Sequence, residues 1–337
     1  MLITIPSISL FLCCYMKKRD LKRLEYWVGD LTAGVFLIFF TLVFRWLSIE
    51  TLVLISKILG RIVFSLLKRY RKRVIENLII AFGREKSPEE IRRLAREVSF
   101  HLLLTPLETI FAYRNSLERF IRKIKIEGKE HLDSALAQGN GVIALGAHLG
   151  SFPLLGARLA IEGYPFNVVI NESNFPRMWK ILNDRQKRLG QNPYPLNPVT
   201  SSIKKSLNCL HRNEILYLVA DEQQRRRGIP VLFFGQTAFT APGPAILSIK
   251  ANAPILPMFV VRENEVKRRL IIGKPIHIER TLEEKKDIEM LTVKFTEIIE
   301  EVVRQYPSQW TWLNRRWKLP SQNNGGTSVI QKLDHRR

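Results

Sequence analysis

The sequence predicts an α/β protein with a mostly parallel central sheet flanked by helices. From residue 141 onward, short apolar runs of strand length alternate with longer segments of helical periodicity. The chain has 337 residues and a hydrophobic content of 46%, which is enough for one large core or two smaller ones. The expected strands are 141–145, 167–170, 215–220, 230–234, 255–261 and 270–272. The expected helices are 151–162, 175–189, 200–211, 242–252 and 282–305.

The N-terminal region is expected to attach the protein to a membrane. Residues 31–47 form an apolar run of roughly spanning length, interrupted only by Arg45. Residues 1–15 are also apolar but form a shorter run. The basic residues next to this run, which begin at Lys17, follow it rather than precede it, and this order argues against a signal peptide. Met16 is therefore an alternative start. Basic residues lie on both sides of 31–47, so a single span and a shallow interfacial helix both stay open, as does a buried helix of a soluble core.

Three regions follow from this pattern. Residues 1–70 are expected to form a membrane-anchoring helical segment, and residues 71–318 are expected to form the α/β domain. Within it, Ser87 precedes Pro88 and two glutamates, a typical helix start. Residues 319–337 are polar, contain two adjacent glycines and are expected to be a disordered tail.

The chain is strongly basic. It contains 53 Lys and Arg against 31 Asp and Glu, a formal net charge of +22. Such an excess implies an acidic partner, and nucleic acid, an anionic membrane or an acidic carrier protein would all qualify. No recognised nucleic-acid module is present, and the apolar N-terminal region favours the membrane over nucleic acid. The three cysteines, Cys13, Cys14 and Cys209, fit neither a disulfide framework nor a zinc site.

Residues 144–156, ALGAHLGSFPLLG, carry the clearest sign of chemistry. An apolar strand stops just before His148, so the histidine is expected at a strand-to-helix corner. Ser151 is expected to cap the next helix, and Pro153 suits its first turn. An imidazole at the carboxyl end of a strand is well placed to act as a general base, although it could merely cap a loop. Without a G-x-S-x-G elbow, such a base suggests direct transfer to a substrate hydroxyl.

Several short blocks follow one another over residues 24–313. They are VIENL at 74–78 with Phe82, GAHLGSF at 146–152, residues 218–221 leading to FFG at 233–235, TAPGPA at 240–245 and APILP at 253–257. In this order they resemble the bacterial late acyltransferases of lipid A biosynthesis, within the wider lysophospholipid acyltransferase group. The resemblance implies an enzyme at the cytoplasmic face of the bacterial inner membrane.

The resemblance also implies the reaction. A fatty acyl chain would move from an acyl carrier protein or coenzyme A thioester to a hydroxyl of a glycolipid or lysophospholipid, such as a lipid A precursor, with no metal or redox cofactor. His148 would be the base. Backbone amides near Gly150, or a nearby arginine, are expected to stabilise the oxyanion.

One position departs from the family pattern. In the family the histidine is followed after four residues by Glu or Asp, which orients the ring, but here that position is Pro153. Glu172, Asp221 and Glu222 follow neighbouring predicted strands, so each could supply the missing carboxylate, with Glu172 and Asp221 as the first candidates. The departure also leaves open a non-catalytic lipid-binding relative that has lost the dyad.

Further residues are expected to bind substrate. Arg185 and Arg188 resemble the family's second block and share a helix face, where their guanidinium groups could meet a phosphorylated acceptor or simply be solvated. Gly150 and Ser151 are expected to contact substrate beside His148. Phe234 and Gly235 could line an acyl channel or belong to the core. The arginine triple at 225–227 could meet phosphate or a carrier protein.

Overall fold

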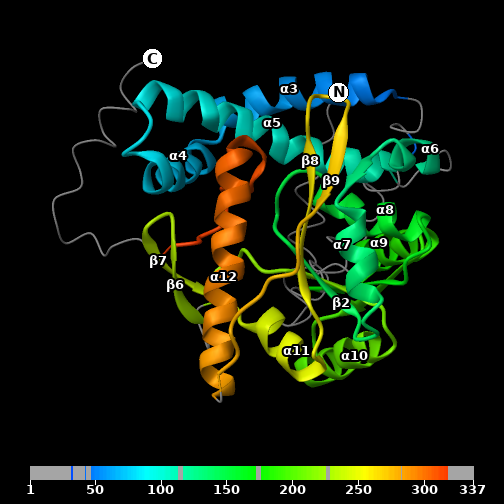
Figure 1. Ribbon diagram of the computed structural model, residues 1–337. Coiled ribbons are helices and arrows are strands. Elements are labelled where there is room, and N and C mark those ends of the chain that lie inside the picture. Colours follow the sequence, from blue (N-terminus) through cyan, green and yellow to red (C-terminus); the bar gives the residue numbers. More distant parts are fainter. Residues whose placement is uncertain are drawn as a thin grey trace, which may run out of the picture.

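Seven strands form one sheet in the computed structural model (Figure 1), which describes residues 32, 42, 47–112, 117–171, 176–224, 228–281 and 283–317. The strands are β1 (Lys125–Glu127), β2 (Val142–Gly146), β3 (Phe166–Ile170), β4 (Gln191–Pro195), β5 (Ile215–Val219), β8 (Ile255–Arg262) and β9 (Arg268–Ile272). Their order is β1-β9-β8-β2-β5-β3-β4. The neighbours from β8 to β4 run parallel, and β9 is antiparallel to β8. The mostly parallel α/β fold expected from the sequence is confirmed.

One expected strand lies outside this sheet. Strand β6 (Ile229–Phe233) pairs with β7 (Gln236–Thr240) in a separate antiparallel hairpin. Strands β1, β4 and β7 were not expected from the sequence. The short run of β4 contains two prolines, which are tolerated because β4 is an edge strand that pairs only with β3.

Helices cover both faces of the sheet. One face carries α7 (Lys129–Leu136), α8 (Leu155–Ile161) and α9 (Pro176–Arg188), and the other carries α10 (Val199–His211), α11 (Gly243–Ala251) and α12 (Glu284–Gln305) (Figure 1). In β2 the side chains of Ile143 and Leu145 join the core beneath α10, α11 and α12, whereas Val142 and Ala144 join the core beneath α7 and α8. All residues of β2 are buried, as a strand covered on both faces requires.

A helical layer lies across one end of the sheet. It consists of α3 (Ile49–Leu66), α4 (Lys68–Phe82) and α5 (Pro88–Ala112), followed by the short α6 (Leu117–Arg122). Helix α3 packs closely on α5, where a Cβ added at Gly60 would approach the backbone of Phe100 at 3.0 Å. The expected start of α5 is confirmed, because Ser87 and Glu90 exchange hydrogen bonds in a capping box.

Several expectations concern residues outside the described part of the chain. These are Glu172, the arginine triple at 225–227, most of the apolar run 31–47 and the tail 319–337. Among the residues that are described, no helix is both long enough and apolar enough to cross a bilayer.

Candidate active site

The register of two neighbouring strands brings His148 beside Asp221. Gly146 ends β2 and Val219 ends β5, and these two residues are paired in the parallel ladder. His148 lies two residues after Gly146, and Asp221 lies two residues after Val219. Both therefore lie at the carboxyl ends of the strands, where parallel α/β folds bind ligands. The result is a hydrogen bond of 2.8 Å between Nδ1 of His148 and Oδ1 of Asp221.

Both oxygens of the Asp221 carboxylate are hydrogen-bonded. Oδ2 accepts the backbone N–H of His148 at 2.9 Å and the indole N–H of Trp310 at 2.7 Å. Full burial by itself disfavours the carboxylate, but the charge of His148 and these hydrogen bonds outweigh burial and hold the pKa of Asp221 below its usual value. Asp221 is therefore a fixed, ionised partner for the imidazole.

The imidazole of His148 has one nitrogen held by the protein and one directed outward. Because an ionised carboxylate can only accept a hydrogen bond, Nδ1 carries the proton that it shares with Asp221. Burial alone would lower the pKa of His148, but the charge of Asp221 with its hydrogen bond, and the charge of Glu222, raise the pKa to about 9. The side chain is 29% exposed, so Nε2 is accessible to a substrate.

Of the two acidic candidates that the structure describes, Asp221 and Glu222, Asp221 meets the distance expected of a substitute carboxylate. Glu222 is 62% exposed, and its Oε1 lies 4.0 Å from Nε2 of His148, beyond hydrogen-bond distance. Pro153 lies in the 3₁₀ helix η1 (Phe152–Leu154) and lines the same cavity as His148. The carboxylate absent from position 153 is thus supplied from a different strand end.

The backbone amides around His148 are already engaged. The N–H of Gly150 donates to the carbonyl oxygen of Gln309 at 3.0 Å, and the N–H of Ser151 donates to that of Val260 at 2.8 Å. The N–H of Leu149 donates to Ala147 at 2.7 Å. These three amides therefore donate to protein oxygens in this structure, and the expectation that amides near Gly150 stabilise an oxyanion stays a prediction.

Gly150 and Ser151 have different environments. Gly150 lines the cavity with a φ of +61°, and a Cβ there would overlap the carbonyl oxygen of Val260, so the position requires glycine. Ser151 is buried and does not cap the following helix as expected. Its hydroxyl instead donates to the carboxylate of Glu108 at 2.8 Å, and this charge-assisted hydrogen bond holds the side chain toward α5.

His148 opens into a mostly apolar cavity of about 460 Å³, a volume typical of small-molecule sites. Helix α5 contributes one wall, and the 3₁₀ helix η1 and the segment after η2 (Pro307–Gln309) contribute others. The cavity is lined by His101, Leu102, Thr105, Pro106, Thr109, Ile110, His148, Gly150, Phe152, Pro153, Leu182, Gln309, Trp310 and Thr311. Trp310 therefore contacts both the cavity and Asp221, a role that the sequence did not indicate.

The remaining predicted substrate residues lie outside this lining. Arg188 is exposed at the end of α9 and Arg185 is half-buried, although Leu182, one turn before Arg185, does line the cavity. Phe234 is buried among aromatic rings, with its centroid 5.1 Å from that of Phe82, which agrees with the alternative of a core residue. Gly235 lies in the turn between β6 and β7.

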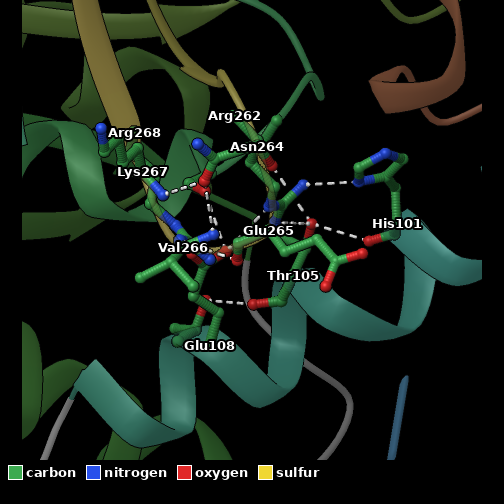
Figure 2. Close-up of polar contacts among 12 residues, drawn as sticks. His101, Thr105, Glu108, Arg262, Asn264, Glu265, Val266, Lys267 and Arg268 are labelled. Atoms are coloured by element: carbon green, nitrogen blue, oxygen red, sulfur yellow. Dashed lines mark hydrogen bonds and ion pairs between the residues drawn. The ribbon is translucent and has the colours of Figure 1, made fainter. Parts of the chain in front are cut away.

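A buried ionic cluster lies beside the cavity (Figure 2). Glu108 of α5 accepts hydrogen bonds from Arg262 at 2.6 Å and from Arg268. Arg262 and Arg268 face each other across the β8–β9 hairpin, and all three side chains are almost fully buried. Nη1 of Arg262 lies 3.4 Å from Nδ1 of His101. Among the described residues, no group of His, Cys, Asp and Glu side chains could hold a metal ion.

Comparisons with known proteins identify the family of this chain. Residues 16–319 match the family of bacterial lipid A biosynthesis acyltransferases. The chain is 24% identical to the lipid A biosynthesis palmitoleoyltransferase of Escherichia coli K12 over 310 residues, which are 89% of this chain and 94% of the relative. It is 24% identical to the lauroyltransferase of the same organism, covering 77% and 83% of the two chains. It is also 24% identical to the phosphatidylinositol mannoside acyltransferase of Mycobacterium tuberculosis, covering 70% and 79%. Since the match spans most of the chain, the protein belongs to the bacterial lipid A biosynthesis acyltransferase family and is an acyltransferase.

Proposed function

We propose that the protein moves a fatty acyl chain from a thioester to a hydroxyl group of a membrane lipid, with His148 as the general base. The observation that carries this proposal is the 2.8 Å hydrogen bond between His148 and the buried Asp221, at a mostly apolar cavity. The proposal that the acceptor is a lipid is supported by the names of the relatives, which are acyltransferases of lipid A biosynthesis and of phosphatidylinositol mannoside. Pro153 had left open that the protein is a non-catalytic relative without a dyad. The hydrogen bond between His148 and the carboxylate of Asp221 supports the catalytic alternative instead.

The reaction uses one proton acceptor and releases one thiol. Nε2 of His148 takes the proton of the acceptor hydroxyl while the hydroxyl oxygen attacks the thioester carbonyl carbon. The tetrahedral intermediate then collapses, the carbon–sulfur bond breaks, and the leaving thiolate receives the proton from Nε2. The products are an ester and a free thiol. Asp221 stays ionised throughout and stabilises the imidazolium that forms between the two proton transfers.

The cavity and the surface charge suggest the two substrates. Apolar side chains such as Leu102, Ile110 and Leu182 suit an acyl chain. Both candidate donors, acyl carrier protein and acyl-coenzyme A, are anionic, and the chain carries a net charge of +22. A phosphorylated glycolipid, such as a lipid A precursor, would meet Arg185 and Arg188 at the end of α9, one turn beyond Leu182.

The outer face of α3 is the part of the described chain that fits a membrane surface. Leu54, Ile58, Ile62 and Leu66 are 56%, 49%, 46% and 72% exposed, and their spacing of four places them in one stripe. Helix α3 lies on α5, which lines the cavity (Figure 1). A helix with an exposed apolar stripe and basic neighbours such as Arg61 can rest in an anionic lipid interface, here the cytoplasmic face of the inner membrane.

Acyl transfer by the purified protein tests this function. The full chain in detergent micelles is given lauroyl-acyl carrier protein or lauroyl-coenzyme A, together with a lipid A precursor or phosphatidylinositol mannoside, and products are read by mass spectrometry. Wild-type protein should form the acylated lipid, and His148→Ala should lower the rate by about a hundredfold or more. His277→Ala is the matched control, because His277 lines a different cavity from His148, and it should keep the wild-type rate. His148→Ala protein with wild-type turnover would refute the mechanism.

A further inference from the structure

The ionic cluster around Glu108 contains more positive than negative charge. Its single carboxylate accepts hydrogen bonds from two guanidinium groups, those of Arg262 and Arg268. Within the described part of the chain, Nη2 of Arg268 is buried and has no hydrogen-bond partner. The cluster therefore holds an excess of one positive charge away from water, next to the wall of the His148 cavity.

His101 connects this cluster to the cavity. Nη1 of Arg262 lies 3.4 Å from Nδ1 of His101, and a guanidinium can only donate hydrogen bonds. Nδ1 must therefore be the acceptor, which assigns the proton of the neutral ring to Nε2. Burial, followed by the charges of Arg262 and Arg268, lowers the pKa of His101 to about 3, so the ring stays neutral at physiological pH.

The Nε2–H group of His101 is available to a ligand. No other described residue forms a hydrogen bond with Nε2, and Figure 2 shows that edge of the ring turned away from Arg262. His101 and His148 line the same cavity. The hydroxyl of Thr105, one turn after His101 on α5, lies 3.1 Å from the carbonyl oxygen of Gly150, so the helix is held against the His148 loop.

Several other donors near His148 are directed elsewhere. The amides of residues 148–151 donate to protein oxygens, and Arg262 directs its Nε and Nη2 groups to Glu108. A neutral imidazole that accepts a hydrogen bond from a cation at one nitrogen is a stronger donor at the other. A neutral histidine polarises a substrate carbonyl in the same way in triosephosphate isomerase.

We propose that His101 is a second catalytic residue, which donates its Nε2–H to the thioester carbonyl oxygen as that oxygen becomes an oxyanion. This inference rests on the proposed function. No proton leaves His101 in the step: the hydrogen bond strengthens when the acceptor oxygen attacks the carbonyl carbon, and weakens when the carbon–sulfur bond breaks and the carbonyl reforms. Arg262 acts through His101 as a positioning residue that fixes the tautomer.

Three variants separate this role from a structural one. His101→Phe keeps a ring but removes both nitrogens. His101→Asn keeps an acceptor near the Nδ1 position for Arg262 but has no donor near Nε2. His101→Gln can place an amide N–H near the Nε2 position. His131→Phe is the matched control, because Nδ1 of His131 is bound to the carbonyl oxygen of Ile272, away from the cavity.

The measurement is kcat and KM for lauroyl-acyl carrier protein and lauroyl-coenzyme A, with the acceptor that wild-type protein uses. His101→Phe and His101→Asn should each lower kcat by about 100- to 1000-fold with little change in the KM of the donor, as loss of an oxyanion donor does. His101→Gln should recover at least a tenth of the wild-type kcat, and His131→Phe should match the wild type. Thermal unfolding of each variant shows whether it is folded. If His101→Phe does not fold, the comparison of kcat between His101→Asn and His101→Gln tests the inference.

The outcomes are distinct. Wild-type kcat in His101→Asn would overturn the inference while leaving the proposed function standing, and so would a change confined to the KM of the donor. Equal losses in the Asn and Gln variants would also overturn it, because they would indicate a packing role. A wild-type protein without acyl transfer would overturn the proposed function and this inference together.

Discussion

The indole of Trp310 donates its N–H to the same oxygen of Asp221 that accepts the backbone N–H of His148. Trp310 reaches this position because its segment runs antiparallel to the His148 loop, with the N–H of Thr311 bound to the carbonyl oxygen of His148 at 3.0 Å. The last described segment of the chain thus contributes a hydrogen bond to the carboxylate that holds His148.

Replacing Trp310 by Phe tests this contact. The change removes one donor from a buried carboxylate, so the pKa of Asp221 should rise and its orientation toward His148 should loosen. We expect kcat to fall about tenfold, which corresponds to roughly 1.4 kcal/mol, near the lower end of the about 1.5 to 3 kcal/mol that a hydrogen bond to a charged group contributes. Trp312→Phe is the control, since its indole N–H binds the carbonyl oxygen of Pro307 instead. Equal kcat losses in the two variants would indicate a packing effect.

Replacing Glu108 by Gln should destabilise the protein strongly. The variant would leave Arg262 and Arg268 buried without a countercharge, and breaking a buried ion pair in this way costs about 3 to 5 kcal/mol. Denaturant unfolding measures the loss. Glu265→Gln is the comparison, because that carboxylate is exposed and pairs with Lys57 at the surface, where such pairs contribute little. Similar free energies of unfolding for the two variants would contradict the claim that Glu108 stabilises the fold by neutralising two buried arginines.

The apolar stripe of α3 is tested by vesicle binding. Leu54→Ser combined with Ile58→Ser should weaken sedimentation of the full chain with anionic phosphatidylglycerol vesicles and leave the fold intact, because both side chains are exposed. The loss should be partial, because the apolar run 31–47, which is expected to contact the membrane as well, is unchanged in this variant. Val293→Ser on α12 removes an exposed apolar side chain elsewhere and serves as the control. Unchanged binding of the double variant would exclude α3 as a lipid contact.

The raised pKa of His148 also affects stability. Its pKa in the folded protein, about 9, lies above the ordinary value of 6.5, so the protonated ring favours the folded state. That contribution is fully present below about pH 6.5 and is lost as the pH rises through about 9. The free energy of unfolding of wild-type protein minus that of His148→Gln should therefore fall by about 3 kcal/mol between these limits. A difference that stays constant with pH would contradict the pairing with Asp221.

The sequence predicted the strand ends but not which strands are neighbours. Glu172 and Asp221 both follow predicted strands, so the local pattern could not choose between them. The sheet order distinguishes the two strands, because β5 lies directly beside β2, whereas β3, which precedes Glu172, is separated from β2 by β5. Strand order depends on long-range packing of whole helices, and no run of residues encodes it locally.

Other parts of the site had no local signal for a similar reason. Trp310 lies in an irregular segment more than 80 residues from Asp221, and nothing in its neighbourhood marks it as a hydrogen-bond donor to that carboxylate. In the sequence, Arg262 and Arg268 cannot be distinguished from ordinary surface arginines. In the fold, the β8–β9 hairpin pairs them, and both donate hydrogen bonds to Glu108 of α5. His101 has the spacing of a residue on an amphipathic helix, and only the fold places it in the cavity of His148.

The pH dependence of kcat/KM tests most directly the claim that His148, paired with Asp221, is the base. Only the neutral ring can take the hydroxyl proton, so kcat/KM should rise about tenfold per pH unit and level off near pH 9, where the pKa of His148 lies. In Asp221→Asn the countercharge is gone, so the rate should fall by about three to four orders of magnitude and level off at a lower pH. A wild-type kcat/KM that does not rise with pH below about 9, or a rise that levels off at the same pH in Asp221→Asn, would contradict the account.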